Sequence, residues 1–205
     1  FWSNQFSYSI MAEDIINYCK YHKLEKVFIL GHSMGGKVAM ELACNYPHLL
    51  KALIIADISP KKYEPKHQKI LNGLSCLDFN KISSRAEADV KLATVIPENN
   101  LRQFLLKNLY WIEKGKLGLR INIEVLKKAN LMIGEELNSN FHSELPCLFL
   151  KGVNSDYILD SDLEMIKRYF PKSKMATISG AGHWLHAENP KEFIEVTSKW
   201  LNEFN

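Results

Sequence analysis

Residues 27–37 read Val-Phe-Ile-Leu-Gly-His-Ser-Met-Gly-Gly-Lys, and this stretch decides the fold that we expect. It begins with four apolar residues, which predict a buried strand of a parallel sheet. Gly31, Ser33 and Gly35 then match the pattern G-x-S-x-G. Residues 37–46 follow with apolar positions at helical spacing, so the motif lies between a strand and a helix. This placement predicts a sharp turn that presents the Ser33 hydroxyl as a nucleophile.

The glycines of the motif have a steric explanation in such a turn. We expect Gly31 and Gly35 to remove side chains that would collide where the strand turns into the helix. The turn also presents the backbone N–H of Met34, at the start of the helix, to negative charge that develops on a substrate oxygen. Met34 is therefore the candidate oxyanion donor. A phosphate-binding loop is excluded because the sequence lacks the G-x-G-x-x-G spacing and the G-K-[ST] ending.

A serine needs a base that accepts its proton, and histidine is suited to this role near neutral pH. Seven histidines are present, and His183 stands out because residues 179–184 form a loop directly after the last predicted strand. We therefore predict that His183 is the base. His32 adjoins Ser33, but we expect its side chain to lean away and to form the wall of the turn. We expect His186 to pack or to cap a helix.

The acid that orients the base has three candidates. Asp57 follows an apolar strand run over residues 52–56, and Asp156 follows another over residues 147–150. Glu124 lies in the middle of the chain. Asp57 and Asp156 also stand where aspartate commonly serves as a turn or cap residue. The residues alone leave all three carboxylates open.

The order of predicted elements indicates an α/β fold with a mainly parallel sheet. Residues 11–60 alternate helix, strand, helix and strand, and the alternation resumes at Cys147. Residues 61–143 break this rhythm, because they lack strong β runs and contain short amphipathic helical stretches. We expect a core made of residues 1–60 and 144–205, interrupted by a helical lid insertion that packs over the C-terminal edge of the sheet.

Capping signals predict where three helices begin. Ser84 with Glu87, inside the insertion, matches the capping-box pattern. Ser161 with Glu164 matches the same pattern in the C-terminal part of the core. Asn189 is the expected N-cap of the last helix, because a proline follows it at the first helical position.

Four segments, distributed over most of the chain, resemble a known family. They are residues 31–37 (GHSMGGK), 56–60 (ADISP), 152–155 (GVNS) and 181–187 (AGHWLHA). In these segments the chain resembles the α/β-hydrolase fold family, and within it the YbfF-type esterases and abhydrolase-domain-11 proteins. Lys37 after the double glycine and the D-I-S-P element are more specific than the general signature of the fold.

The resemblance implies a serine hydrolase that cleaves small-molecule carboxylic esters or thioesters through an acyl-enzyme on Ser33. It implies that Asp57, at the end of the strand after the motif, is the acid, with Asp156 as the alternative. It implies no metal and no organic cofactor. Two other functions share the fold: a catalytically silent ligand-binding module, and a lipase or acyltransferase that uses the same triad.

The chain departs from the family at its N-terminus. Members of the fold begin with several strands and a His-Gly loop that supplies a second oxyanion donor, whereas this chain opens at Phe1 close to the first predicted helix. We therefore expect that the N-terminal strands are missing from it. Loss of one oxyanion donor costs on the order of 10²–10³ in rate.

Composition excludes several other functions. The net charge is +3 and no basic run is long enough to predict binding to nucleic acid or to an anionic membrane. No run approaches the roughly 18–20 apolar residues of a membrane span. The four cysteines are widely spaced and lack zinc-site spacing, which favours free thiols in a reducing compartment. We expect an intracellular protein, cytoplasmic or organellar, and the sequence does not indicate its oligomeric state.

Overall fold

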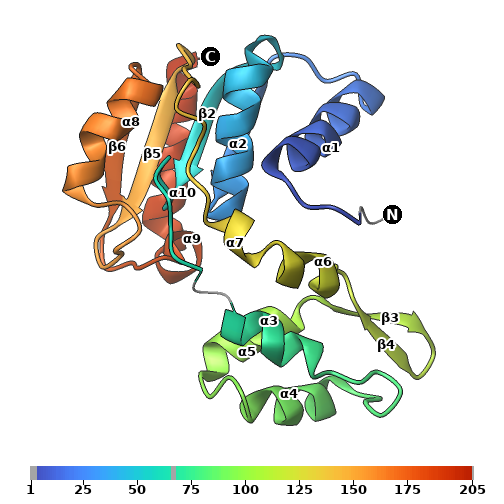
Figure 1. Cartoon of the computed structure of the whole chain (residues 1–205). Coiled ribbons are helices and arrows are strands. Elements are labelled where there is room, and N and C mark those ends of the chain that lie inside the picture. The colour runs from blue at the N-terminus through green and yellow to red at the C-terminus, as the bar shows by residue number, and fades with distance from the viewer. Residues whose placement is uncertain (1–3, 66–67, 205) are drawn as a thin grey trace. The chain divides into compact units, whose positions relative to one another are not determined.

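The computed structural model describes residues 4–65 and 68–204, and the chain divides into two compact units (Figure 1). The sheet unit comprises Ser7–Tyr63 and Glu135–Asn205. The insertion unit comprises Glu64–Gly134 together with Phe1–Phe6. The ends of the segment expected as an insertion, residues 61–63 and 135–143, thus belong to the sheet unit.

The sheet unit is built on four parallel strands in the order β1-β2-β5-β6. They are β1 (Val27–His32), β2 (Leu50–Ala56), β5 (Cys147–Gly152) and β6 (Ser173–Ile178). This confirms the predicted parallel sheet. Because all four strands run in one direction, their carboxyl ends lie at one edge, and the loops that follow them meet there.

Helices cover both faces of this sheet (Figure 1). One face packs against α1 (Tyr8–Tyr21), α2 (Met34–Asn45) and α8 (Leu163–Tyr169). The other face packs against α9 (Leu185–Glu188) and α10 (Pro190–Leu201). Alternate residues of β2 serve the two faces, since Leu53 and Ile55 join the first core whereas Ile54 and Ala56 join the second. Short 3-10 turns complete the unit at Pro47–Leu49, Asp160–Asp162 and Asn202–Phe204.

The helix starts of the sheet unit follow local capping chemistry, with one correction. Asn189 caps α10 as predicted, because its side chain accepts the N–H of Glu192. The expected capping box of Ser161 with Glu164 is wrong. A 3-10 turn comes first, and the Asp162 carboxylate accepts the N–H of Leu159 at 2.9 Å. Helix α8 therefore starts only after that turn.

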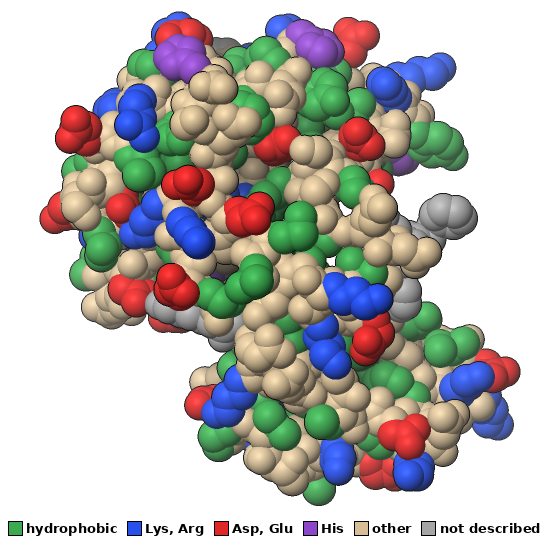
Figure 2. Space-filling model, in the orientation of Figure 1, with side chains coloured by type: hydrophobic (Ala, Val, Ile, Leu, Met, Phe, Trp, Pro, Cys, Tyr) green, Lys and Arg blue, Asp and Glu red, His purple; other side chains and the backbone are tan. Residues whose placement is uncertain are grey.

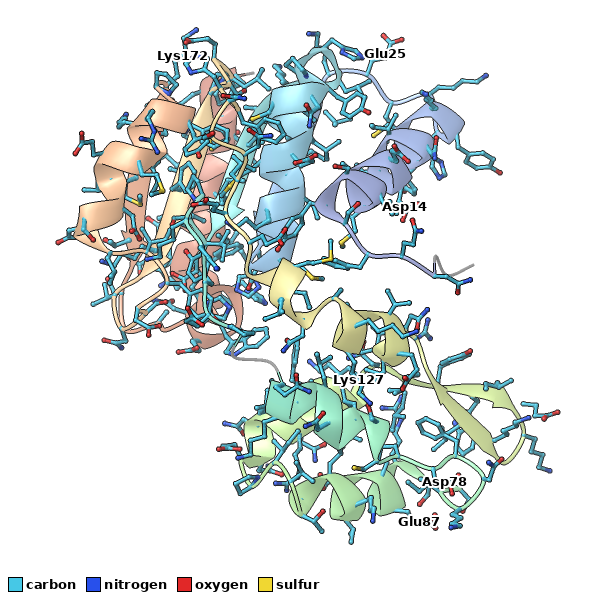
Figure 3. All side chains as sticks on the ribbon, viewed as in Figure 1. Asp14, Glu25, Asp78, Glu87, Lys127 and Lys172 are labelled. Atoms are coloured by element: carbon cyan, nitrogen blue, oxygen red, sulfur yellow. The ribbon has the colours of Figure 1, made fainter. Side chains whose placement is uncertain are left out.

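The insertion unit has a core of its own. Its helices are α3 (Gln68–Ser75), α4 (Arg85–Ala93), α5 (Asn99–Leu106), α6 (Ile123–Lys128) and α7 (Asn130–Ile133). Buried leucines from these helices pack together, among them Leu71, Leu92 and Leu105. The predicted cap of α4 is confirmed, since Ser84 accepts the N–H of Glu87, whose side chain is labelled in Figure 3.

An antiparallel hairpin corrects the interpretation of the insertion as wholly helical. Strands β3 (Leu109–Glu113) and β4 (Lys116–Leu119) pair with each other in a separate two-stranded sheet. Gly115 forms the turn between them with a φ of 83°, a backbone conformation that glycine adopts at little cost. The packing of the insertion over the sheet edge stays a prediction.

Charged side chains of both signs are spread over the surface. Figure 2 shows basic and acidic side chains interspersed over the visible face. A bilayer-crossing helix must be long and apolar, and no helix within residues 4–65 and 68–204 satisfies both conditions. All four cysteines have free thiols, as expected, and those of Cys19 and Cys147 are buried.

Candidate active site

Ser33 occupies a strained turn between β1 and α2. Its φ is 53° and its ψ is −119°, a conformation that a residue with a side chain adopts only when its surroundings impose it. Two backbone bonds do so: the Ser33 N–H donates to Ala56 O at 3.0 Å, and the Ser33 carbonyl accepts from Gly36 N at 2.8 Å. The Ser33 side chain makes no capping bond to α2, so its hydroxyl is left for other partners.

Close approach explains two of the three glycines at this turn. A Cβ on Gly31 would lie 2.2 Å from the carbonyl oxygen of Gly35, and one on Gly36 would lie 2.4 Å from a methyl of Ile58. A Cβ on Gly35 would meet nothing within 4 Å. The steric role expected for Gly35 is therefore wrong. The collision at Gly31 is with backbone, and the helix approaches the loop after β2 most closely at Gly36.

Three chain segments bring a serine, a histidine and an aspartate into line. His183 Nε2 lies 3.1 Å from Ser33 Oγ, and His183 Nδ1 lies 2.8 Å from Asp57 Oδ2. Ser33 follows β1, Asp57 follows β2, and His183 lies in the loop after β6. The side chain of Asp57 is fully buried, whereas that of His183 is 17% exposed. The two sequence candidates for nucleophile and base thus meet one of the three candidate acids.

The buried carboxylate of Asp57 has further partners. Its Oδ1 accepts the N–H of Gly152 at 3.1 Å, and its Oδ2 also accepts the hydroxyl of Ser155. Asp57 itself has a φ of 50°, and its N–H donates to Leu150 O at 2.8 Å. Strand β5 therefore contributes to holding an acid that follows β2. Sequence reasoning missed Ser155, although it stands in the GVNS segment that carried the resemblance.

The other two candidate acids belong to other segments of the chain. Asp156 is an exposed residue of the loop after β5. Glu124 belongs to α6 in the insertion unit, where its carboxylate pairs with Lys127 at 3.9 Å. Lys127 is labelled on that helix in Figure 3.

Tyr157 and His32 hold the ring and backbone of His183. The Tyr157 ring stacks on the imidazole with centroids 3.7 Å apart and planes at 17°. His32 Nε2 lies 2.8 Å from the carbonyl oxygen of His183. Since a carbonyl only accepts, Nε2 of His32 carries the proton of this bond. His32 thus supports the loop that carries His183. The sequence predicts a place for His32 in the wall of the turn but does not predict this contact.

Burial sets the charge state of two histidines beside the base. It lowers the pKa of His32 to about 4, and the neighbouring His183 and His186 add to this effect, while the bond to the His183 carbonyl opposes it. Burial also lowers the pKa of His186, with His183 contributing. The His186 ring packs against His32 with centroids 4.8 Å apart. Both rings are therefore neutral neighbours of His183 at neutral pH.

Met34 is the first residue of α2. The first N–H groups of a helix have no acceptor within it, and the helix dipole favours negative charge at that end. Met34 directly follows Ser33, and its N–H has no acceptor within the helix. In the part of the chain that the structure describes, no cluster of three or more His, Cys, Asp or Glu side chains could hold a metal ion.

Comparisons with known proteins show the family to which the chain belongs. The sequence profile of the α/β hydrolase fold matches residues 1–77. A Haemophilus influenzae protein named as an esterase/lipase is 36% identical over 206 residues, which cover 99% of this chain and 70% of the relative. The chain belongs to the α/β-hydrolase fold family. The resemblance stated from the four segments is thereby confirmed.

One further relative and one solved structure are similar to this α/β hydrolase. The sn-1-specific diacylglycerol lipase ABHD11 of Mus musculus is 32% identical over 203 residues, covering 95% of this chain and 65% of the relative. The solved structure of a marine microorganism esterase superposes with a TM-score of 0.91 at 42% identity, covering 96% of this chain and 78% of that one. These matches identify the chain as an esterase-like hydrolase.

Proposed function

We propose that the chain hydrolyses carboxylic esters or thioesters through an acyl-enzyme on Ser33. One observation carries this proposal: the contacts from Ser33 Oγ to His183 Nε2 at 3.1 Å and from His183 Nδ1 to Asp57 Oδ2 at 2.8 Å. A hydroxyl in reach of an imidazole whose second nitrogen is held by a buried carboxylate is the arrangement that activates a serine.

The first half of the proposed reaction forms the acyl-enzyme. Ser33 Oγ attacks the carbonyl carbon while His183 Nε2 takes the hydroxyl proton. The imidazolium that forms is stabilised by Asp57, which also fixes the ring with Nδ1 protonated. Met34 N–H donates to the carbonyl oxygen as it becomes negative. His183 then gives its proton to the departing alcohol or thiol, and the acyl group remains on Ser33.

The second half releases the acid. A water molecule attacks the acyl carbon, and His183 Nε2 accepts one of its protons. When the second tetrahedral intermediate collapses, the same proton returns to Ser33 Oγ and the carboxylic acid leaves. No group outside the substrate, water and these side chains enters the proton balance.

The relatives support an ester as the bond that is cleaved. They are named as an esterase/lipase, a diacylglycerol lipase and an esterase. A lipase or acyltransferase reaction would use the same three side chains, so the substrate and acceptor separate these activities. A silent binding module is disfavoured, because such a protein has no use for a strained serine aligned with a base and a buried acid.

The proposal is tested with a fluorophosphonate on the longest natural chain, followed by intact-mass analysis. We expect one covalent adduct, formed with loss of fluoride, on the wild type and on Ser161→Ala. Ser33→Ala should give none. The same three proteins are then assayed with p-nitrophenyl esters, acyl thioesters and peptides. A well-folded wild type that forms no adduct and cleaves no ester would overturn the proposal.

A further inference from the structure

Lys37, the residue after the double glycine, is buried in the first turn of α2. Only 1% of its surface is exposed. Its ammonium donates three hydrogen bonds, to Pro60 O at 2.9 Å, Lys61 O at 2.7 Å and Glu135 O at 3.0 Å. An ammonium has three donors, so backbone carbonyls use its whole capacity.

These carbonyls belong to the two segments of the sheet unit that lead into and out of the insertion. Pro60 and Lys61 precede Tyr63, the residue at which the sheet unit ends before the insertion. Glu135 is the residue at which the sheet unit resumes after it. The two segments also bond each other, because Leu137 N donates to Pro60 O at 2.8 Å. Lys37 of α2 therefore bonds both the segment that leads into the insertion and the segment that follows it, and all of these residues lie within the sheet unit.

A series of ring contacts continues from this point to the base. The Lys37 ammonium lies 5.5 Å from the centroid of the Tyr63 ring. Tyr63 stacks on Tyr157 with centroids 5.4 Å apart, and its hydroxyl donates to Tyr157 O at 2.7 Å. Tyr157 in turn stacks on His183. The segment that leads into the insertion is thus connected to the His183 imidazole through the rings of Tyr63 and Tyr157.

Neither filling of space nor helix stability explains a lysine here. A methionine has similar length and no charge, so it would fill the site without the penalty of burying an ion. That penalty is visible in the pKa of Lys37, which burial lowers to about 7 although the Glu136 carboxylate opposes the shift. A cation in the first turn of a helix is also disfavoured by the helix dipole. The three carbonyl bonds, together with the Glu136 carboxylate and the Tyr63 ring, offset these costs.

We propose that Lys37 is a positioning residue that holds to α2 the two segments that lead into and out of the insertion. Through Tyr63, it also holds Tyr157 against His183. Its catalytic consequence rests on the function proposed above. Without the ammonium, the two segments separate, and Tyr63 no longer holds Tyr157 against the imidazole of His183. Catalysis that depends on the orientation of His183 then slows more than substrate binding weakens.

The first test compares Lys37→Met with Lys62→Met, which removes an exposed lysine of the segment that leads into the insertion. Hydrogen exchange of the full chain is measured at Leu137, whose N–H bonds Pro60. We expect exchange about tenfold faster in Lys37→Met, because the opening of this local contact becomes easier. Equal exchange at Leu137 in the two variants would overturn the proposal. If Lys37→Met does not fold, Lys37→Gln, with a shorter neutral donor, carries the same comparison.

The second test separates binding from chemistry. For a small reactive ester, we expect kcat in Lys37→Met to fall about threefold or more with KM nearly unchanged, while Lys62→Met matches the wild type. A merely destabilised protein would lose apparent kcat only in proportion to its unfolded fraction, which urea unfolding measures. If wild type and variants all lack ester hydrolysis, the proposed function fails, and the exchange at Leu137 still decides the role of Lys37.

Discussion

The hydroxyl of Ser155 donates to Oδ2 of Asp57, the same oxygen that lies 2.8 Å from His183 Nδ1. The N–H of Gly152 donates to the other carboxylate oxygen, Oδ1, at 3.1 Å. Because Asp57 is fully buried, these donors replace water around its charge and also prevent the carboxylate from rotating. Strand β5 thus fixes the direction in which an acid that follows β2 faces the base.

Replacing the acid should distinguish the two aspartates. We expect Asp57→Asn to lower kcat for a reactive ester about 10³–10⁴-fold, because an amide N–H opposite Nδ1 favours the wrong tautomer of His183. Asp156→Asn should stay within about threefold of the wild type, as an exposed residue does away from the reacting atoms. Steady-state kinetics of both variants check this. A large loss in Asp156→Asn with full kcat in Asp57→Asn would reverse the assignment.

Removing the hydroxyl beside the acid should have a smaller effect. We expect Ser155→Ala to lower kcat about 10-fold to 100-fold, the range that corresponds to one hydrogen bond to a charged group. KM should change little, because Ser155 acts on Asp57 and not on the substrate. Ser161→Ala is the matched control in the same part of the chain. Identical kcat values in the two variants would show that the Ser155 bond does not support the acid.

His32 should make stability depend on pH. Its folded pKa is about 4, and the ordinary value is 6.5, so the unfolded chain binds more protons between these two values. The free energy of unfolding should therefore fall as the pH falls from 6.5 towards 4. After solvent screening we expect His32 to contribute on the order of 2 kcal/mol to this loss.

The variant His32→Gln isolates this contribution, since glutamine keeps an N–H donor for the His183 carbonyl and does not titrate in this range. Urea unfolding at pH 7 and pH 4.5 gives the change in unfolding free energy for each protein. Between those two pH values the variant should lose less stability than the wild type. Parallel losses in both proteins would contradict the prediction, because the remaining histidines are common to them.

The two neighbouring glycines of α2 should respond in opposite ways to a methyl group. Gly36→Ala brings a Cβ within 2.4 Å of Ile58 and should lower stability by about 1–3 kcal/mol, as overpacking does. Gly35→Ala meets nothing within 4 Å and should be neutral or stabilising by up to about 1 kcal/mol, because alanine favours helix. Thermal and urea unfolding check the pair. Equal losses would indicate that backbone strain at Ser33, and not contact with Ile58, limits both positions.

Features with a local cause could be predicted from the sequence. Strands β2 and β5 were visible because a buried parallel strand is a continuous apolar run. The run of β1 was visible in the same way, but the prediction that it is buried is wrong, because Phe28 and Leu30 are exposed. The cap at Asn189 was visible because the proline that follows it cannot lie deeper in a helix. The hairpin β3–β4 was missed, although Leu109–Glu113 is rich in apolar and aromatic residues and Gly115 follows at the turn. That pattern is a strand signal which the surrounding helical stretches obscured.

Features that depend on which segments become neighbours could not be predicted. The residues alone could not choose between Asp57 and Asp156, because that choice depends on which carboxylate reaches the His183 loop. From the sequence, Lys37 looks like an ordinary helix lysine. Its burial depends on three carbonyls from distant segments, which only the structure brings together. The steric role expected of Gly35 falls instead on Gly36, because the approach of Ile58 is a tertiary contact.

The adjacency of β2 and β5 has an evolutionary consequence. Two residues that follow these strands, Asp57 and Ser155, meet at Oδ2 of Asp57, the oxygen that faces Nδ1 of His183. A single change from serine to aspartate at position 155 would supply a second carboxylate there while the first is still in place. A lineage can therefore transfer the acid from one strand to its neighbour through an intermediate that never lacks one. In distant homologues the acid is best located by its spatial relation to the histidine, since its distance along the chain from the serine is free to change.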